Sequence, residues 1–179
     1  MGGGGRPYKS LREHLDRGKS VGHVTLEYMI YNSERTNEDV VRVLIERGAA
    51  KKGGILGGTH LLHQLVGKGK LDAVDMLLRL GVEADIRNDR GITPLIHVFG
   101  TTEELSPNYK DIARRLIKGG ADIAAEASKG ETAVVFVIDN GRVEALNFLL
   151  AQGAKIEADH LVQASMSGHL EIIDALLMH

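Results

Sequence analysis

The stretch "LDAVDMLLRLGVEAD", residues 71–85, decides the fold, because it combines an amphipathic helix with the signal that ends it. Its apolar residues stand at i, i+3, i+6 and i+7, which places them on one face of a helix. These residues are Leu71, Val74, Leu77 and Leu78. Gly81 follows the last turn, where glycine adopts at little cost the left-handed conformation that caps a helix. The stretch predicts a helix that ends just before Gly81.

The same pattern recurs in "YKDIARRLIKGGADI" (109–123) and "RVEALNFLLAQGAKI" (142–156). The glycines that end such helices are Gly18, Gly48, Gly81, Gly120 and Gly153, with spacings of 30, 33, 39 and 33 residues. A second set, which marks the end of an earlier helix in each unit, is Gly69, Gly141 and Gly168. Gly69 precedes Gly81 by 12 residues, and Gly141 precedes Gly153 by the same distance. Because the two sets keep one offset, they indicate an internal repeat of about 33 residues.

Each unit also contains a shorter helix upstream, for example in "TPLIHVF" (93–99). Thr93 is a typical N-cap residue, and Pro94 suits the first helical position, where its missing N–H costs nothing. The repeat unit is therefore predicted to be a pair of helices.

Two motifs resemble the signature of ankyrin repeats. "ITPLIHV" (92–98) is similar to the T-P-L-H-x-A pattern, and "GGADI" (119–123) is similar to the turn that follows the second helix. On that register the signature tetrads are His60–His63, Thr93–Ile96 and Thr132–Val135, with weaker equivalents at Glu27–Ile30 and Asp159–Val162. The resemblance covers about residues 24–179 and implies an all-α, ankyrin-type solenoid of stacked helix-turn-helix repeats, about five repeats plus a partial N-terminal one.

The resemblance also sets the expected domain organisation. We expect a flexible leader at 1–9 and a single ankyrin-repeat domain at 10–179. Its units are about 10–23 (partial), 24–58, 59–91, 92–130, 131–157 and 158–179. One unit has extra residues at 101–108 between its two helices, and the link from Gly153 to Asp159 is about six residues shorter than its equivalents.

Composition limits the function classes. The formal charge of −2 favours neither nucleic acid nor anionic membrane as a partner. The sequence contains no run of about 18 apolar residues, the length that a helix needs to cross a bilayer. The absence of cysteine excludes disulfides, thiolate metal sites and a cysteine nucleophile, and it is compatible with an intracellular, cytoplasmic location, with the nucleus also open. Because aromatic residues are only 4% of the chain, we expect an aliphatic core.

In ankyrin repeats, partner contacts concentrate on the fingers between repeats and on the exposed ends of the first helices, so the resemblance implies a binding surface on the concave side. The candidate partner-binding residues are Glu34, Arg35, Lys68, Asp89, Arg90, Ile92, Ser128, Lys129, Glu131, Asp139, Asn140 and Met166. Each of them alone is equally an ordinary solvated position, so the candidate site is the group. The inserted 101–108 loop is a second candidate, because long loops often carry function.

Catalytic and metal motifs are weak by comparison. "GKSVG" (18–22) fits a nucleophile elbow, but a helical pattern precedes Ser20 where that motif needs a strand. His60 and His63 are expected at i, i+3 on one helix, and His97 from the next repeat could complete a zinc site with them. Against zinc, His63 stands at the signature histidine, for which the resemblance implies a structural hydrogen bond. We expect neither a metal nor a cofactor.

The leading hypothesis is a non-catalytic, monomeric module that binds a protein partner. The alternative is an enzyme or small-ligand binder on a modified ankyrin solenoid, with a concave-side pocket lined by His60, His63, His97 or Asp139. A third hypothesis is that the chain is a fragment of a longer array in which other repeats bind the partner.

Overall fold

The computed structural model describes residues 55–56, 59–100 and 104–179. The expected leader 1–9, the partial unit 10–23 and most of the unit 24–58 lie outside these residues. Glu34 and Arg35, two of the candidate partner-binding residues, also lie outside the described residues.

The described part contains eight α-helices and one short antiparallel pair of strands. The helices are α4 (Leu61–Gly67), α5 (Leu71–Arg79), α6 (Pro94–Phe99), α7 (Tyr109–Lys118), α8 (Ala133–Asp139), α9 (Val143–Ala151), α10 (Ala158–Ser167) and α11 (Leu170–Leu177). The strands are β1 (Ile55–Leu56) and β2 (Thr59–His60), with Ile55 opposite His60 and Leu56 opposite Thr59.

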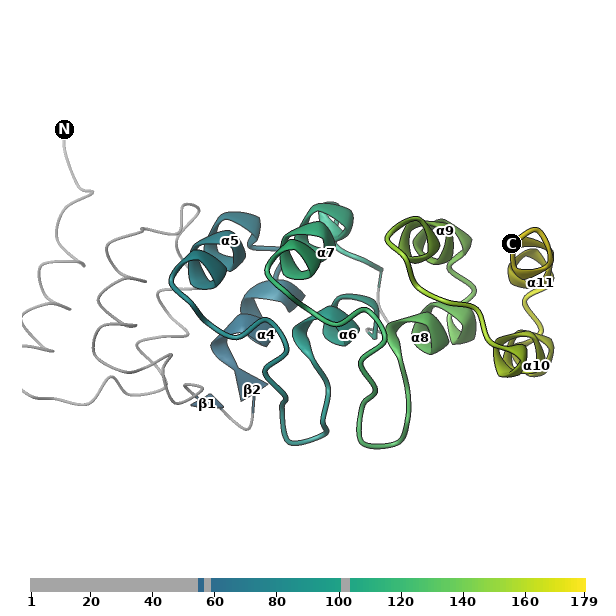
Figure 1. The fold of residues 1–179 in the computed structure, drawn as a ribbon, viewed down its shortest axis with the longest axis horizontal. Helices are drawn as coiled ribbons and strands as arrows, with labels where there is room; N and C mark the ends of the chain where they lie inside the picture. Colours follow the sequence, from purple (N-terminus) through teal and green to yellow (C-terminus); the bar gives the residue numbers. More distant parts are fainter. Residues whose placement is uncertain (1–54, 57–58, 101–103) are drawn as a thin grey trace, which may run out of the picture.

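The helices form two rows along the long axis of the molecule (Figure 1). The helices α4, α6, α8 and α10 form one row, and α5, α7, α9 and α11 form the other. In the first row each helix packs against its neighbours, and each pair also packs internally. The predicted solenoid of stacked helix-turn-helix units is thereby confirmed.

The glycines at the helix ends have the predicted left-handed conformation. Gly81, Gly120 and Gly153 have φ values of +83°, +97° and +98°. The N–H of Gly81 donates to the carbonyl of Leu78, and the N–H of Val82 donates to that of Leu77, both at 3.0 Å. These two bonds satisfy the carbonyls that the last helical turn leaves free, so glycine both ends the helix and sets the direction of the exit.

The predicted N-caps of the short helices are also present. The hydroxyl oxygen of Thr93 accepts from the N–H of Ile96 at 3.3 Å, and that of Thr132 accepts from the N–H of Val135 at 3.2 Å. Pro94 occupies the first turn of α6. The shared cap fixes where α6 and α8 begin and keeps these two units in register.

His60 lies in β2, directly before α4, so the expectation that His60 and His63 share one helix is wrong. The reason is the extended pairing of Thr59 and His60 with Leu56 and Ile55, which delays the helix to Leu61. The i, i+3 spacing of the two histidines therefore does not place them on one helical face.

The core is mainly aliphatic, as expected, but one junction is aromatic. Phe99, Tyr109 and Phe148 form a cluster whose ring centroids are 5.9, 6.2 and 6.4 Å apart, and Phe99 is fully buried. Helices α7 and α9 lie farther apart than α5 and α7 (Figure 1), and the large rings fill the space between them. The expectation of a purely aliphatic core is wrong at this junction, because the chain places three of its few rings there.

The two departures from the repeat length lie where the sequence predicts them. Residues 100–108 connect α6 to α7, whereas only 140–142 connect α8 to α9. The end of the insertion rests on the preceding unit, because the amide Nδ2 of Asn108 donates to the carbonyl of Gly69 at 2.7 Å. The link from α9 to α10 is confined to 152–157, which leaves no room for a finger.

Gly120 isolates the conformational contribution of these glycines, because a Cβ atom added there meets nothing within 4 Å. We expect Gly120→Ala to lower the free energy of unfolding by about 1 kcal/mol, the usual penalty for a left-handed alanine. The melting temperature should fall by about 2–4 °C. Gly120→Asn is the matched control and should recover most of the loss, since asparagine tolerates this conformation. Equal losses in both variants, measured by thermal and urea unfolding, would contradict a backbone origin.

Candidate functional site

Two hairpin-like fingers project from the helices on one side of the molecule (Figure 1). The first finger comprises residues 82–92 and the second comprises residues 121–131. Each closes in the same way: the N–H of Asn88 donates to the carbonyl of Ile92 at 3.1 Å, and the N–H of Ala127 donates to that of Glu131 at 2.8 Å. The fingers are therefore equivalent, 39 positions apart.

The fingers are joined sideways by three hydrogen bonds. The N–H of Ser128 donates to the carbonyl of Arg90 at 3.1 Å. The guanidinium Nη1 of Arg87 donates to the carbonyl of Glu126 at 2.5 Å, and the carboxylate of Asp85 accepts from the N–H of Asp122 at 2.8 Å. These bonds turn two loops into one continuous surface.

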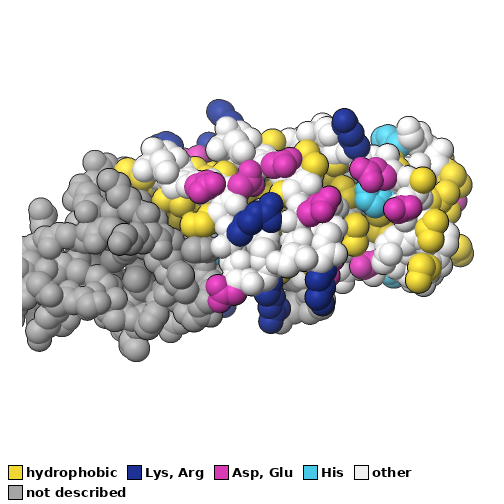
Figure 2. Space-filling model, turned by 60° about the horizontal axis from the view of Figure 1, so that its bottom comes forward, with side chains coloured by type: hydrophobic (Ala, Val, Ile, Leu, Met, Phe, Trp, Pro, Cys, Tyr) yellow, Lys and Arg dark blue, Asp and Glu magenta, His cyan; other side chains and the backbone are white. Residues whose placement is uncertain are grey.

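The tips of this surface carry four of the candidate residues. Asp89, Arg90, Ser128 and Lys129 are all exposed, and the bond from Ser128 to Arg90 brings the two tips together. Figure 2 views this side of the molecule and shows Lys and Arg side chains projecting from its lower rim. The tips thus present exposed charged and polar side chains that are not part of the core.

Three other candidate residues make contacts within the protein. Ile92 packs against the small apolar cluster of Ile96, Ala125 and Ala127. The side-chain amide of Asn140 donates to the carbonyl of Phe136 at 2.7 Å. The carboxylate of Asp139, although exposed, accepts hydrogen bonds from α10.

Asp139 connects α8 to α10 through two of these bonds: Gln163 Nε2 donates at 2.5 Å and the hydroxyl of Ser167 at 3.1 Å. Its main role in the structure is therefore to hold two helices together.

The remaining candidates lie apart from the fingertips. Lys68 is exposed just after α4, and Glu131 is half-buried at the base of the second finger. Met166 is 79% exposed on α10. Figure 2 shows that apolar side chains gather at the C-terminal end of the molecule. The candidate set thus divides between the paired fingertips and more distant positions.

A groove of about 500 Å³ runs along the second finger on the side away from the first finger. It is bounded by the second finger, the start of α8, the link 153–157 and the first turns of α10. Ile123, Val134 and Val135 supply apolar lining. The groove exists because the short link leaves no third finger to cover this flank.

The exposed charges of the groove are mostly acidic. Glu126, Glu157 and Asp159 line it together with one cation, Lys155. The Glu157 carboxylate also caps α10 by accepting from the N–H of His160. These groove residues are not among the candidates predicted from the sequence, although the short spacing between Gly153 and Asp159 is the signal that could have found them.

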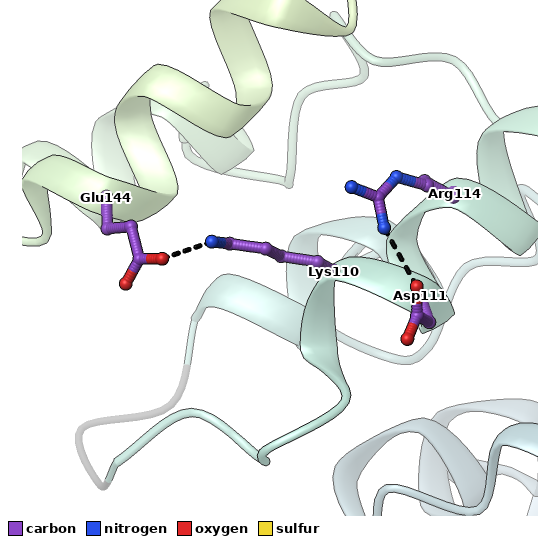
Figure 3. Close-up of polar contacts among 4 residues, drawn as sticks. All are labelled: Lys110, Asp111, Arg114 and Glu144. Atoms are coloured by element: carbon purple, nitrogen blue, oxygen red, sulfur yellow. Dashed lines mark hydrogen bonds and ion pairs between the residues drawn. The ribbon is translucent and has the colours of Figure 1, made fainter.

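The opposite side of the molecule carries ion pairs between the helices of the second row. Figure 3 shows Lys110 of α7 reaching Glu144 of α9, and Arg114 paired with Asp111 at 2.8 Å within α7. The hydrogen bond that Lys110 donates to the carboxylate of Glu144 is the main reason that the pKa of Lys110 is raised. Arg114 also lies over the ring of Phe148, 5.2 Å from its centroid. These contacts bridge α7 and α9 across the aromatic junction.

A family model described as ankyrin repeats (three copies) matches residues 62–160 and, in a second alignment, residues 102–179. Together the two matches cover well over half of the chain. The chain belongs to the ankyrin-repeat family. Ankyrin repeats generally mediate protein–protein interaction, and similar members are typically interaction or regulatory proteins without catalytic activity.

Three curated relatives illustrate the similarity. The protein fem-1 homolog A-like of Mus musculus is 34% identical over 74 residues, which are 38% of this chain and 11% of that protein. The human transient receptor potential cation channel subfamily A member 1 is 31% identical over 127 residues, 67% of this chain and 11% of the channel. The human protein phosphatase 1 regulatory subunit 27 is 38% identical over 74 residues, 41% of this chain and 44% of that protein.

This ankyrin chain therefore spans less than half the length of each of these relatives. The similarity lies in the repeats. None of the helices in the described ranges has the length and the apolar character needed to cross a membrane.

The signature histidine of the ankyrin repeat has the structural role that the sequence predicts. His63 is fully buried in α4, and its Nε2 lies 2.7 Å from the carbonyl of Ile92 in the first finger. This bond connects the short helix of one unit to the finger that leads into the next. His63 therefore supports the finger surface from beneath.

His97 approaches His63 from the next unit, as expected, with ring centroids 5.7 Å apart. No group of three metal-ligating side chains is found among the described residues. His97 lines a hollow of only about 90 Å³ beside Glu104 and Tyr109, below the 300–1,000 Å³ typical of ligand pockets. The pair acts as a packed contact between repeats.

Burial lowers the pKa of His97 below its ordinary value of 6.5. The unfolded chain therefore takes up a proton near pH 6.5 that the folded chain accepts only at lower pH. The stabilisation by neutral His97 is complete above pH 6.5 and is lost as the pH falls through 6.5 toward the folded pKa.

We expect the melting temperature of the ankyrin chain to fall between pH 7 and pH 5, and His97→Gln to fall less over the same interval because its side chain takes up no proton. The matched control is His179→Gln at the exposed C-terminus, which should keep the full pH dependence. Identical pH profiles for wild type and His97→Gln would show that His97 is not the group responsible.

Proposed function

We propose that this ankyrin chain is a non-catalytic module that binds a protein partner through the surface formed by its fingers and short helices. The observation that carries the proposal is the lateral bond from Ser128 to Arg90, which joins the two exposed tips. A surface made of such tips can be varied without disturbing the core, because none of the tip side chains is buried.

The size and charge of the surface suit a protein more than a small molecule. A stable protein–protein interface buries about 800 Å² on each partner, which requires an extended surface of many residues. The tips offer both signs of charge, with Asp89 beside Arg90 and Lys129 nearby. Mixed charge of this kind supports recognition by complementarity with a particular partner.

The enzyme or small-ligand alternative finds less support. The pocket expected for it was to be lined by His60, His63, His97 or Asp139. The hollow at His97 holds only about 90 Å³, and the carboxylate of Asp139 is already bonded to α10. We therefore keep the interaction module as the single proposed function. We also propose that the module is monomeric, that its partner is neither a nucleic acid nor a membrane, and that it is located inside the cell, in the cytoplasm or the nucleus.

The fingertips give the test of this proposal. We expect Arg90→Ala with Lys129→Ala to weaken binding of a captured protein partner by about tenfold or more, since truncating interface anchors typically costs 1–2 kcal/mol each. The partner is obtained by affinity capture with the full chain and mass spectrometry, and binding is then measured by calorimetry.

The matched control is Asp72→Ala with Lys118→Ala, two exposed residues on the row of helices opposite the fingers. This variant should bind the partner with unchanged affinity. If the control variant weakened binding while the fingertip variant did not, the binding surface would lie on the other side of the molecule.

A further inference from the structure

The lateral bonds between the fingers show what a finger requires on its C-terminal side. In the first finger, the carbonyl of Arg90 and the carboxylate of Asp85 accept hydrogen bonds from N–H groups of the second finger. The guanidinium of Arg87 donates a hydrogen bond to a carbonyl of the second finger. The carbonyl of Arg90 and the carboxylate of Asp85 therefore have their partners on the second finger, and Arg87 bonds both to the second finger and to the carbonyl of Gly91 in its own finger.

The second finger has no such neighbour. Its equivalents of Asp85, Arg87 and Arg90, 39 positions on, are Ala124, Glu126 and Lys129. Within the described ranges, the carbonyl of Lys129 and the carboxylate of Glu126 make no hydrogen bond or ion pair. The free flank of the second finger is one wall of the groove of about 500 Å³.

The chemistry of this wall differs from that of the first finger at two positions, because Ala124 lacks the carboxylate that Asp85 supplies and the charge at position 126 is reversed. Glu126 stands where the first finger has Arg87, so an acceptor replaces a donor. Asp159 at the start of α10 adds a second exposed carboxylate that has no ion pair among the described residues. The carboxylates of Glu126 and Asp159 and the carbonyl of Lys129 can only accept hydrogen bonds.

We propose that the groove binds an extended, basic segment of the protein partner, which lies along the second finger in the place of a third finger. A backbone N–H of the segment donates to the carbonyl of Lys129. Its Arg or Lys side chains pair with Glu126 and Asp159, and its alternate side chains contact Ile123 and Val135. This inference rests on the proposed function, since it names the part of a partner that the module recognises.

The remaining charges in the groove agree with a basic occupant. Glu157 contributes a further negative charge while it caps α10, and Lys155 is the one cation. An acidic segment would face three carboxylates, and an uncharged one would leave Glu126 and Asp159 without partners. Basic side chains in the segment match the net charge of the groove.

The probe is a capped peptide, acetyl-(Thr-Arg)₃-amide, titrated into the ¹⁵N-labelled full chain and followed by NMR. We expect amide shifts confined to 123–135 and 153–163, with a dissociation constant of about 0.1–1 mM at low salt. The matched acidic peptide, acetyl-(Thr-Glu)₃-amide, should bind about tenfold more weakly or not at all. Raising NaCl from 50 to 300 mM should weaken binding of the basic peptide.

Variants assign the binding to the groove. Glu126→Gln with Asp159→Asn should weaken the basic peptide about fivefold or more. The matched control, Asp72→Asn with Glu83→Gln, removes two exposed carboxylates outside the groove and should leave the affinity unchanged. Far-ultraviolet circular dichroism and melting temperature confirm that both variants remain folded.

Four outcomes overturn the inference: equal affinity for both peptides, shifts located elsewhere, no shift at 5 mM peptide, or concentration-dependent groove shifts without peptide. The last outcome would assign the groove to the basic fingertips of a second copy. If the fingertip variant weakens binding of the captured partner and the groove variant does not, the proposed function stands and this inference fails. If the peptide binds the groove but neither variant affects binding of any captured partner, the proposed function fails, and the assignment of the groove to a segment of the partner fails with it.

Discussion

The structure depends on one constraint: a single pair of short helices in this chain cannot bury its own apolar face. Leu65, Leu77, Leu116 and Leu149 are nearly or completely inaccessible, and they are covered from both members of a pair and from the next pair. Burying one such leucine stabilises the fold by about 1.5–3 kcal/mol, so each pair gains most of its stability from its neighbours. The caps and the turns then matter because they keep neighbouring pairs in register, and the fingers between pairs remain free for other contacts.

Changes in repeat length alter this arrangement locally without breaking it. The insertion at 101–108 coincides with a wider space between α7 and α9, which the rings of Phe99, Tyr109 and Phe148 fill. The shortened link at 152–157 has the opposite effect, because it removes a finger and leaves an acidic groove beside the second finger. The first change therefore alters the core between units, whereas the second change creates surface that a regular repeat would not have, directly beside the second finger.

Regular features of the repeat could be predicted from the sequence because local chemistry determines them. Gly81, Gly120 and Gly153 mark helix ends since only glycine takes their φ values easily, and Thr93 and Thr132 mark helix starts through their own side chains. Contacts between units could not be predicted in this way, because the repeat register gives a backbone position and not its neighbour in space. For this reason the aromatic junction and the bonds of Asp139 to α10 emerge only from the structure.

The most direct test of this account is amide hydrogen exchange across the full chain, followed by NMR or mass spectrometry. Helices α6 to α9 have a helix pair on each side, whereas α10 and α11 make their main contacts among the described helices with α8, with α9 and with each other. If contacts between neighbouring pairs hold the stack together, amides of α8 and α9 exchange slowly and those of α11 exchange much faster. Protection of α11 equal to that of α8 would contradict stabilisation by successive neighbours.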